Sequence, residues 1–210
     1  MKLKLNNMKI KKFNDEIAWK EARKTKITGS RLKDIVVLRG TGKKIGFYEL
    51  IAERLAIPRP EGEDKMARGH ELEPVAIELT EKELGKTFNK ELVIWERDEE
   101  ACIAISPDAF LDDLTEAIEV KCLGSAKQIK AIIENQPEDE YKWQYLQYFI
   151  VNDKLEKLHV VMYDPSFVES LQYKRFEITR EELKEDIETY LEYQRKELEE
   201  IGEIVNKLSF

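Results

Sequence analysis

The chain has 210 residues, of which 37% are charged, and its formal net charge is −8. This length favours one domain with a substantial core, and no apolar stretch approaches the roughly 20 residues that a membrane span needs. The two cysteines, Cys102 and Cys122, lie in apolar runs and do not indicate a disulfide framework. Composition therefore predicts a single domain over residues 1–210 in the cytoplasm, with the basic segment 1–12 as a candidate flexible N-terminus.

Hydrophobic periodicity and capping signals predict alternating helices and strands. The predicted helices cover residues 14–24, 28–37, 47–56, 64–84, 125–134, 138–152 and a final segment that opens at the Thr-Arg-Glu-Glu capping box of residues 179–182. The predicted strands cover residues 88–97, 101–110, 117–122, 158–163 and 173–178. Pro74 is expected to kink the long helix. This order predicts a mixed sheet with helices on its faces.

The most informative segment is Ser106-Pro107-Asp108, which is followed after ten intervening residues by Glu119-Val120-Lys121. Residues i and i+2 of a strand share a face, so Glu119 and Lys121 project together, and a hairpin brings Asp108 beside them. Two carboxylates suit Mg²⁺ or Mn²⁺, and a lysine can orient or deprotonate a water. The pattern predicts a metal-dependent phosphodiesterase core; the alternative is a cross-strand ion pair on a solvated face.

The distribution of charge along the chain qualifies its acidic total. Residues 1–44 hold 14 Lys and Arg against 4 Asp and Glu, whereas residues 45–210 hold 21 against 39. A basic N-terminal quarter on an acidic body is typical of local phosphate binding, and the alternative is a solvated helical surface.

Further segments in chain order accompany this pair of motifs. They are Ala18-Trp-Lys-Glu-Ala-Arg23, Ile27-Thr-Gly-Ser30, Arg68-Gly-His-Glu-Leu-Glu-Pro74, Tyr141-Lys-Trp-Gln144 with Gln147, and Tyr163-Asp-Pro165. From about Phe13 to the C-terminus, the chain resembles the lambda exonuclease and YqaJ-type recombinase family within the PD-(D/E)XK nuclease superfamily. It departs from the family at Ala109, where glycine is usual, and at Leu123, where proline is common.

The resemblance implies an α/β fold with a restriction-endonuclease-like core, in which helices flank a mixed central β-sheet. The implied catalytic residues are Asp108, Glu119, Lys121 and Glu73. The implied ligands of Mg²⁺ or Mn²⁺ are Asp108, Glu119, Glu73 and the backbone carbonyl of Val120. The residues implied to hold the 5′-terminal phosphate of DNA are Arg23, Ser30, Ser106 and Gln144.

The segment Arg39-Gly-Thr-Gly-Lys-Lys44 is expected to form a basic loop that contacts the DNA backbone through Arg39, Lys43 and Lys44, which predicts a salt-dependent affinity. His70 shares a helix face with Glu73 and is interpreted as a structural or DNA-contacting residue, with metal ligation as the alternative. Asp98 is interpreted as an ordinary turn aspartate, with a supporting role at the site as the alternative.

The remaining aromatic and histidine positions are interpreted as packing residues. Helical spacing favours core packing over base stacking for Trp143, Tyr145, Tyr148 and Phe149, and His159 is expected to pack within a strand.

The resemblance further implies a Mg²⁺-dependent exonuclease that degrades the 5′-ended strand of linear duplex DNA. It would release mononucleotides and leave 3′ single-stranded tails for recombination by strand annealing. The expected partners are DNA ends with a 5′-phosphate, a single-strand annealing protein and further copies of the chain in a homotrimeric ring. The expected origin is a phage or prophage in a bacterial cell. The alternatives are a structure- or sequence-specific endonuclease on the same core and a non-catalytic DNA-end-binding recombination protein.

Overall fold

The structure is a computed structural model that describes residues 8–38, 43–55, 64–98, 100–123 and 125–209. The strands are β1 (Met8–Lys12), β2 (Val93–Arg97), β3 (Glu100–Ile105), β4 (Ala109–Phe110), β5 (Glu116–Lys121), β6 (Lys157–Tyr163) and β7 (Tyr173–Thr179). The α-helices are α1 (Glu16–Arg23), α2 (Gly29–Leu32), α3 (Ile45–Arg54), α4 (Asp64–Leu84), α5 (Ser125–Glu134), α6 (Lys142–Val151), α7 (Glu169–Gln172) and α8 (Lys184–Leu208). Two 3-10 helices, η1 (Asp139–Tyr141) and η2 (Glu181–Leu183), precede α6 and α8.

Within the described residues the strands form two sheets. One is antiparallel with the order β1-β2-β3, and the other has the order β4-β5-β6-β7. In the second sheet β5 and β6 are parallel, while β4 and β7 run antiparallel to their neighbours. A parallel pair needs a long crossover, which here contains α5 and α6. The predicted α/β class with a mixed sheet is confirmed, and the earlier strands separate into an antiparallel sheet of their own.

Local signals explain where two of the helices begin and end. Asp15 caps α1, because its carboxylate accepts a hydrogen bond of 2.8 Å from the Ala18 amide. α4 covers the predicted range and stops before Gly85, which has φ +63°. The next amide, that of Lys86, donates to the carbonyl of Glu81 at 3.2 Å, which closes the helix in the manner that favours glycine at this position.

Several predicted boundaries differ from the structure. The second helix ends at Leu32 and not near residue 37, because the following residues turn and Gly46 donates to the Asp34 carbonyl at 3.2 Å. The strand predicted over residues 101–110 is interrupted at Pro107, which has no amide hydrogen for a ladder. Residues 8–12 form β1 on the edge of β2, although the sequence suggested a flexible segment there.

The core lies between the sheets and α6. The Trp95 ring packs edge-on against Phe110 and Tyr148, with centroid separations of 5.3 and 6.5 Å. The residues of α6 from Tyr145 to Val151 are all buried. A second cluster joins α2, α3 and α8, and a third places α4 against β5 and β6. α6 is therefore held on several sides, which fixes the side chains that it directs toward β5.

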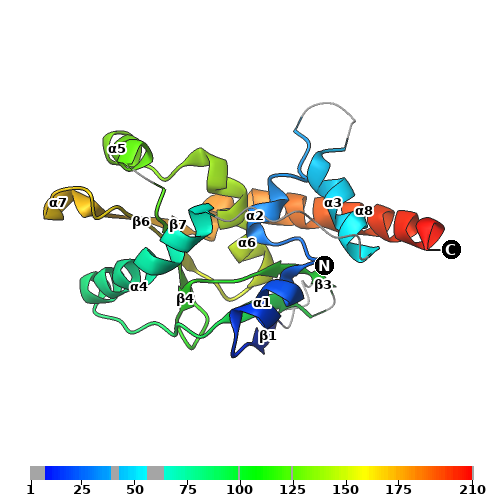
Figure 1. The fold of residues 1–210 in the computed structure, drawn as a ribbon, viewed down its shortest axis with the longest axis horizontal. Coiled ribbons are helices and arrows are strands. Elements are labelled where there is room, and N and C mark those ends of the chain that lie inside the picture. The colour runs from blue at the N-terminus through cyan, green and yellow to red at the C-terminus, as the bar shows by residue number, and fades with distance from the viewer. Residues whose placement is uncertain (1–7, 39–42, 56–63, 99, 124, 210) are drawn as a thin grey trace.

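α8 passes alongside α3 and ends next to the C-terminus (Figure 1). It is joined to α6 by a reciprocal pair of side-chain amides. Gln147 donates to Gln194 at 3.0 Å and Gln194 donates back at 2.9 Å, and both side chains are fully buried. Gln147 also donates to the carbonyl of Ile27 at 2.9 Å, just before α2. Each buried amide thus has partners, as a polar group in a core requires.

Candidate active site

The turn at Ser106-Pro107-Asp108 places Asp108 against β5. Across the β4–β5 hairpin, Ala109 pairs with Ile118. The Asp108 amide donates to the Ile118 carbonyl at 3.3 Å, and the Asp108 carboxylate accepts the Val120 amide at 2.7 Å. The hairpin therefore holds this carboxylate beside the backbone of the Glu-x-Lys segment.

Glu119 and Lys121 project to one face of β5, as the strand period predicts. The Lys121 ammonium lies 2.5 Å from Glu119 Oε1. Gln144 on α6 donates to the same oxygen at 2.6 Å and accepts a hydrogen bond from Lys121 at 2.8 Å. These three side chains form a closed triangle of polar contacts, so α6 fixes the lysine as well as the carboxylate.

The second oxygen of Glu119 is held by a residue to which the sequence assigned only core packing. Tyr148 lies one helical turn after Gln144 and donates its hydroxyl hydrogen to Glu119 Oε2. The ring is fully buried in the core, so the packing prediction is correct for the ring but omits the hydroxyl. The signal that could have identified it is the i, i+4 spacing from Gln144, which places both residues on one helix face.

Three carboxylates influence one another at this point. Burial raises the pKa of Asp108 well above its ordinary value, and the negative charges of Glu119 and Glu73 raise it further. Burial and the charge of Glu119 likewise raise the pKa of Glu73 to about 7, with a smaller contribution from Glu16 on α1. Such a mutual shift is typical of carboxylates that share a small, poorly solvated space.

The donor set fits a hard divalent cation, because carboxylate oxygens that repel one another are stabilised by a positive charge between them. Among the described residues, no three side chains already close around a metal position. The oxygens of Glu119 are instead occupied by Lys121, Gln144 and Tyr148. Binding a cation would require part of this hydrogen-bonding arrangement to rearrange.

Arg23 and Ser106 supply hydrogen-bond donors beside the carboxylates. The Arg23 guanidinium lies 4.2 Å from the centroid of the Trp19 ring and makes no hydrogen bond or ion pair with the described residues. Burial lowers its pKa, while the negative charges of Glu119 and Asp108 act in the opposite direction. The Ser106 hydroxyl is buried and lacks a hydrogen-bond partner in the described part of the chain. A buried polar group without a partner is costly, which indicates a ligand position.

Ser30 is exposed in α2, at the helix end that lies close to Gln144. A Cβ added to the neighbouring Gly29 would lie 2.5 Å from Ile105 Cδ1 and 2.8 Å from Gln144 Cγ. Glycine is therefore required for this close approach of α2 to α6. The serine that was predicted to bind phosphate thus lies beside the helix that carries Gln144, and its hydroxyl is accessible.

The predicted basic loop is engaged within the chain. The Lys43 ammonium lies 2.9 Å from both carboxylate oxygens of Glu197 and 2.6 Å from Glu200 on α8. Lys44 donates to the carbonyl of Lys33 at 3.0 Å. The charge of Lys43 is therefore neutralised locally, and the arrangement does not support it as a DNA contact.

The remaining predicted positions lie away from the carboxylates or outside the description. Arg39 and the side chain of His70 lie outside the described residues. Asp98 forms an ion pair with Lys9 on β1, in keeping with a turn role. His159 is buried in β6 and contacts Glu116 at 3.1 Å and Arg175 at 3.2 Å, so it is a structural residue.

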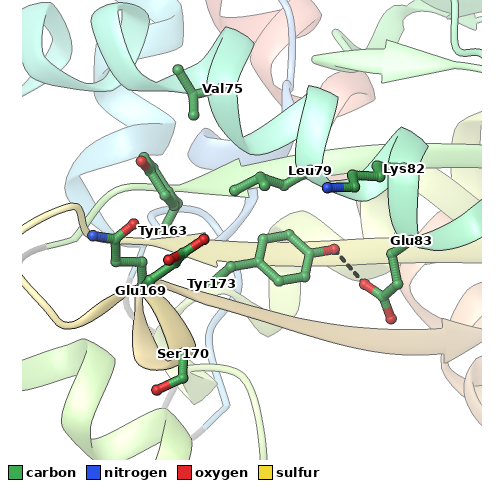
Figure 2. Close-up of a pocket in the computed structure, with 9 residues that line it drawn as sticks. Val75, Leu79, Lys82, Glu83, Tyr163, Glu169, Ser170 and Tyr173 are labelled. Atoms are coloured by element: carbon green, nitrogen blue, oxygen red, sulfur yellow. Dashed lines mark hydrogen bonds between the residues drawn. The ribbon is translucent and has the colours of Figure 1, made fainter.

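A hollow of about 670 Å³ lies between α4, α7 and the facing ends of β6 and β7 (Figure 2). The residues that line it are Val75, Leu79, Lys82, Glu83, Tyr163, Glu169, Ser170, Gln172 and Tyr173. The Tyr173 hydroxyl donates to Glu83 at 2.7 Å, as the dashed line in Figure 2 marks. None of these residues belongs to the predicted site.

Comparisons with known proteins agree with this geometry. Two structures of the alkaline exonuclease LHK-Exo from Laribacter hongkongensis, one in complex with dAMP, match with a TM-score of 0.77 each. They share 27% and 28% identity and cover 92% of this chain and 96% and 98% of their own. A phage-related exonuclease from Haemophilus somnus 129PT matches with a TM-score of 0.61 at 18% identity, over 87% of this chain and 96% of its own, which shows the fold alone.

The solved structures confirm the predicted restriction-endonuclease-like core. No curated protein sequence matches the chain significantly. Among the described residues no helix is both long and apolar enough to cross a membrane. The YqaJ-like viral recombinase domain matches residues 18–154, which include the hairpin and α6. The chain therefore belongs to the family of YqaJ-like viral recombinase domains.

Proposed function

We propose that the chain is a metal-dependent deoxyribonuclease that degrades the 5′-ended strand of linear duplex DNA from its end. The observation that carries this proposal is the convergence of Asp108, Glu119 and Lys121 at the β4–β5 hairpin. The fold that holds these residues is similar to that of an alkaline exonuclease over 92% of the chain.

Asp108, Glu119, Glu73 and the carbonyl of Val120 would hold the cation, which is expected to be Mg²⁺, with Mn²⁺ as a substitute. When bound, the cation supplies positive charge that polarises the phosphodiester and stabilises the leaving oxygen. The raised pKa values of Asp108 and Glu73 support this assignment, because burial and then the charge of neighbouring carboxylates disfavour their ionised forms, which a bound cation would stabilise.

Lys121 would orient the attacking water and offset negative charge on the phosphoryl group. Its contact with Glu119 and Gln144 holds the ammonium at a defined place on the face of β5. The water oxygen forms a bond to phosphorus, the bond from phosphorus to the 3′ oxygen breaks, and that oxygen takes up a proton. The released nucleotide keeps a 3′-hydroxyl and the shortened strand gains a 5′-phosphate, so each product end is the next substrate.

Arg23, Ser106 and the exposed Ser30 would bind the terminal 5′-phosphate. Arg23 can donate to two phosphate oxygens at once, and the hydroxyls add neutral hydrogen bonds. Gln144 is better suited to positioning Glu119 and Lys121, because both ends of its amide are already used there. A relative binds dAMP, a mononucleotide, which is the class of product that this reaction releases.

We propose that the 3′ tails left by this reaction serve recombination by strand annealing, with a single-strand annealing protein as partner. A homotrimeric ring and an origin in a phage or prophage belong to the same proposal. Membership of a family of viral recombinase domains supports the proposed origin and the role in recombination. The mass of the assembly in solution, measured by light scattering, tests the ring directly.

The activity is tested with internally labelled linear duplexes that end in 5′-phosphate or 5′-hydroxyl, beside a closed circle. We expect mononucleotide release from linear DNA with Mg²⁺, faster from 5′-phosphate ends, and none with EDTA or in Lys121→Ala. Arg23→Gln should abolish the preference for 5′-phosphate, whereas Lys174→Ala, which removes a lysine from β7, is the matched control. Cleavage of the circle would instead support an endonuclease, and binding without cleavage would support a non-catalytic end-binding protein.

A further inference from the structure

The Tyr141 ring is surrounded by three ammonium groups that belong to different elements. Lys121 at the end of β5 lies 4.6 Å from the ring centroid, Lys127 on α5 lies 5.5 Å away, and Lys33 at the end of α2 lies 5.9 Å away. An aromatic face attracts each cation by about 0.5–1 kcal/mol at an exposed site. The three like charges still repel one another, so the ring gathers positive charge without neutralising it.

The three lysines differ in their remaining contacts. Lys121 is paired with Glu119 in the catalytic cluster. Lys127 forms an ion pair with Glu140, which precedes the ring in η1. Lys33 is exposed and has no carboxylate partner among the described residues. The cluster therefore keeps one accessible cation that has no ion-pair contact in the described part of the chain, although its charge and that of Glu140 interact at longer range.

Other cations extend the same surface. Lys44 donates to the backbone of Lys33, and Lys142 lies over the Trp143 ring at 4.8 Å. Both side chains are exposed. Of the neighbouring acids, Glu138 is paired with Lys130 at 3.3 Å. On an otherwise acidic chain, this is a local basic surface that borders the proposed site.

We propose that Lys33 and Lys127, arranged around Tyr141, bind a backbone phosphate of the DNA strand next to the phosphodiester that Lys121 attends. This inference rests on the proposed function, and it adds a phosphate position separate from the terminal one at Arg23 and Ser106. Lys33 and Lys121 contact the same ring, so their ammonium groups are separated by no more than the sum of their distances to its centroid. This upper bound allows both groups to contact one strand at nearby phosphates, which follow one another about every 3.4 Å of the helix axis.

The test measures binding of a fluorescent 5′-phosphorylated duplex by anisotropy over a range of salt concentrations, with Ca²⁺ in place of Mg²⁺. Each phosphate contact contributes about 0.7–0.9 to the slope of log affinity against log salt. The double variant Lys33→Ala/Lys127→Ala should lower the slope by this amount, so raising salt from about 50 to 200 mM weakens the wild type about threefold more than the double variant, and each single variant should have a slope between the two. Glu140→Gln, which releases Lys127, should strengthen binding at low salt.

Lys174→Ala is the control. The Lys174 ammonium lies 5.5 Å from the centroid of the Phe176 ring on β7, so this substitution removes a similar lysine–aromatic pair from another part of the molecule. In cleavage assays the two cluster variants should raise KM severalfold and leave kcat close to that of the wild type. A slope equal to that of the wild type in the double variant would overturn the inference. The binding assay requires no cleavage, so it tests the phosphate position even if the wild type proves inactive. An inactive wild type would refute the proposed function only.

Discussion

Removal of the Tyr148 hydroxyl tests whether α6 orients the carboxylate of Glu119 for a cation. The change Tyr148→Phe removes the donor to Glu119 Oε2 and keeps the ring, which is fully buried, so no cavity forms. A hydrogen bond to a charged group is worth about 1.5–3 kcal/mol. We expect this hydrogen bond to stay in place and to orient Glu119 while a cation displaces the contacts at Oε1, so loss of the hydroxyl should lower the affinity for Mn²⁺ roughly 10- to 100-fold, as is usual for partners that orient metal ligands.

The assay is titration of Mn²⁺ into the purified chain, followed by calorimetry or by the loss of free-ion electron paramagnetic resonance signal. Tyr145→Phe is the matched control, because Tyr145 is a buried tyrosine of the same helix whose hydroxyl makes no hydrogen bond with the described residues. The Mg²⁺ concentration that gives half-maximal cleavage should shift in parallel with the Mn²⁺ affinity. If Tyr148→Phe bound Mn²⁺ as tightly as the wild type, the reasoning that the hydroxyl fixes Glu119 would be refuted.

Three further predictions follow from contacts elsewhere in the chain. Gly29→Ala should destabilise the fold by about 1–3 kcal/mol and reduce cleavage, because the new Cβ would overlap Ile105 and displace Gln144. Gly202→Ala on α8, where a Cβ meets no other atom, should be neutral or slightly stabilising in the same urea unfolding experiment. Lys43→Ala should lower stability by about 1–3 kcal/mol, because buried Glu197 loses its partner, and should leave the salt dependence of DNA binding unchanged. A reduced salt slope in that variant would restore Lys43 as a DNA contact. Burial lowers the pKa of His159 below 6.5, so the unfolded chain binds more protons and stability should fall as the pH drops below that value. His159→Gln should reduce this loss when unfolding is compared at about pH 7.5 and about pH 5.5, and an unchanged difference would contradict it.

The core of the candidate site could be predicted because its geometry is local. The strand period fixes Glu119 and Lys121 on one face, and a short hairpin brings Asp108 beside them. The helix periods of α4 and α6 were also strong enough to define those elements. By contrast, the electrostatic coupling of Glu73 to this cluster depends on how α4 packs against β5, which motif resemblance suggested and spacing alone could not show.

Long-range pairings explain most of what the sequence could not reveal. Lys43 looked like a free cation in a loop, and its partner Glu197 lies 154 residues further along the chain. β1 has the sequence Met-Lys-Ile-Lys-Lys, whose alternation is weak, and it forms because β2 offers an edge. The helical pattern correctly predicts that Tyr148 is a core residue, and only the tertiary fold brings its hydroxyl to Glu119 on β5. Each case involves a partner that only the tertiary fold brings close.

The reciprocal amides of Gln147 and Gln194 have a consequence for the boundaries of the functional unit. The family similarity ends at residue 154, whereas Gln194 lies on α8, well beyond it. Gln147 lies between Gln144 and Tyr148 in sequence. Its hydrogen bonds to Gln194 on α8 therefore stabilise the segment of α6 whose side chains contact Glu119. A chain shortened to the matched region would retain each side chain proposed to be catalytic and would lose the contact between Gln147 and Gln194 that supports α6. The minimal sequence signature and the minimal working enzyme are thus different lengths of polypeptide.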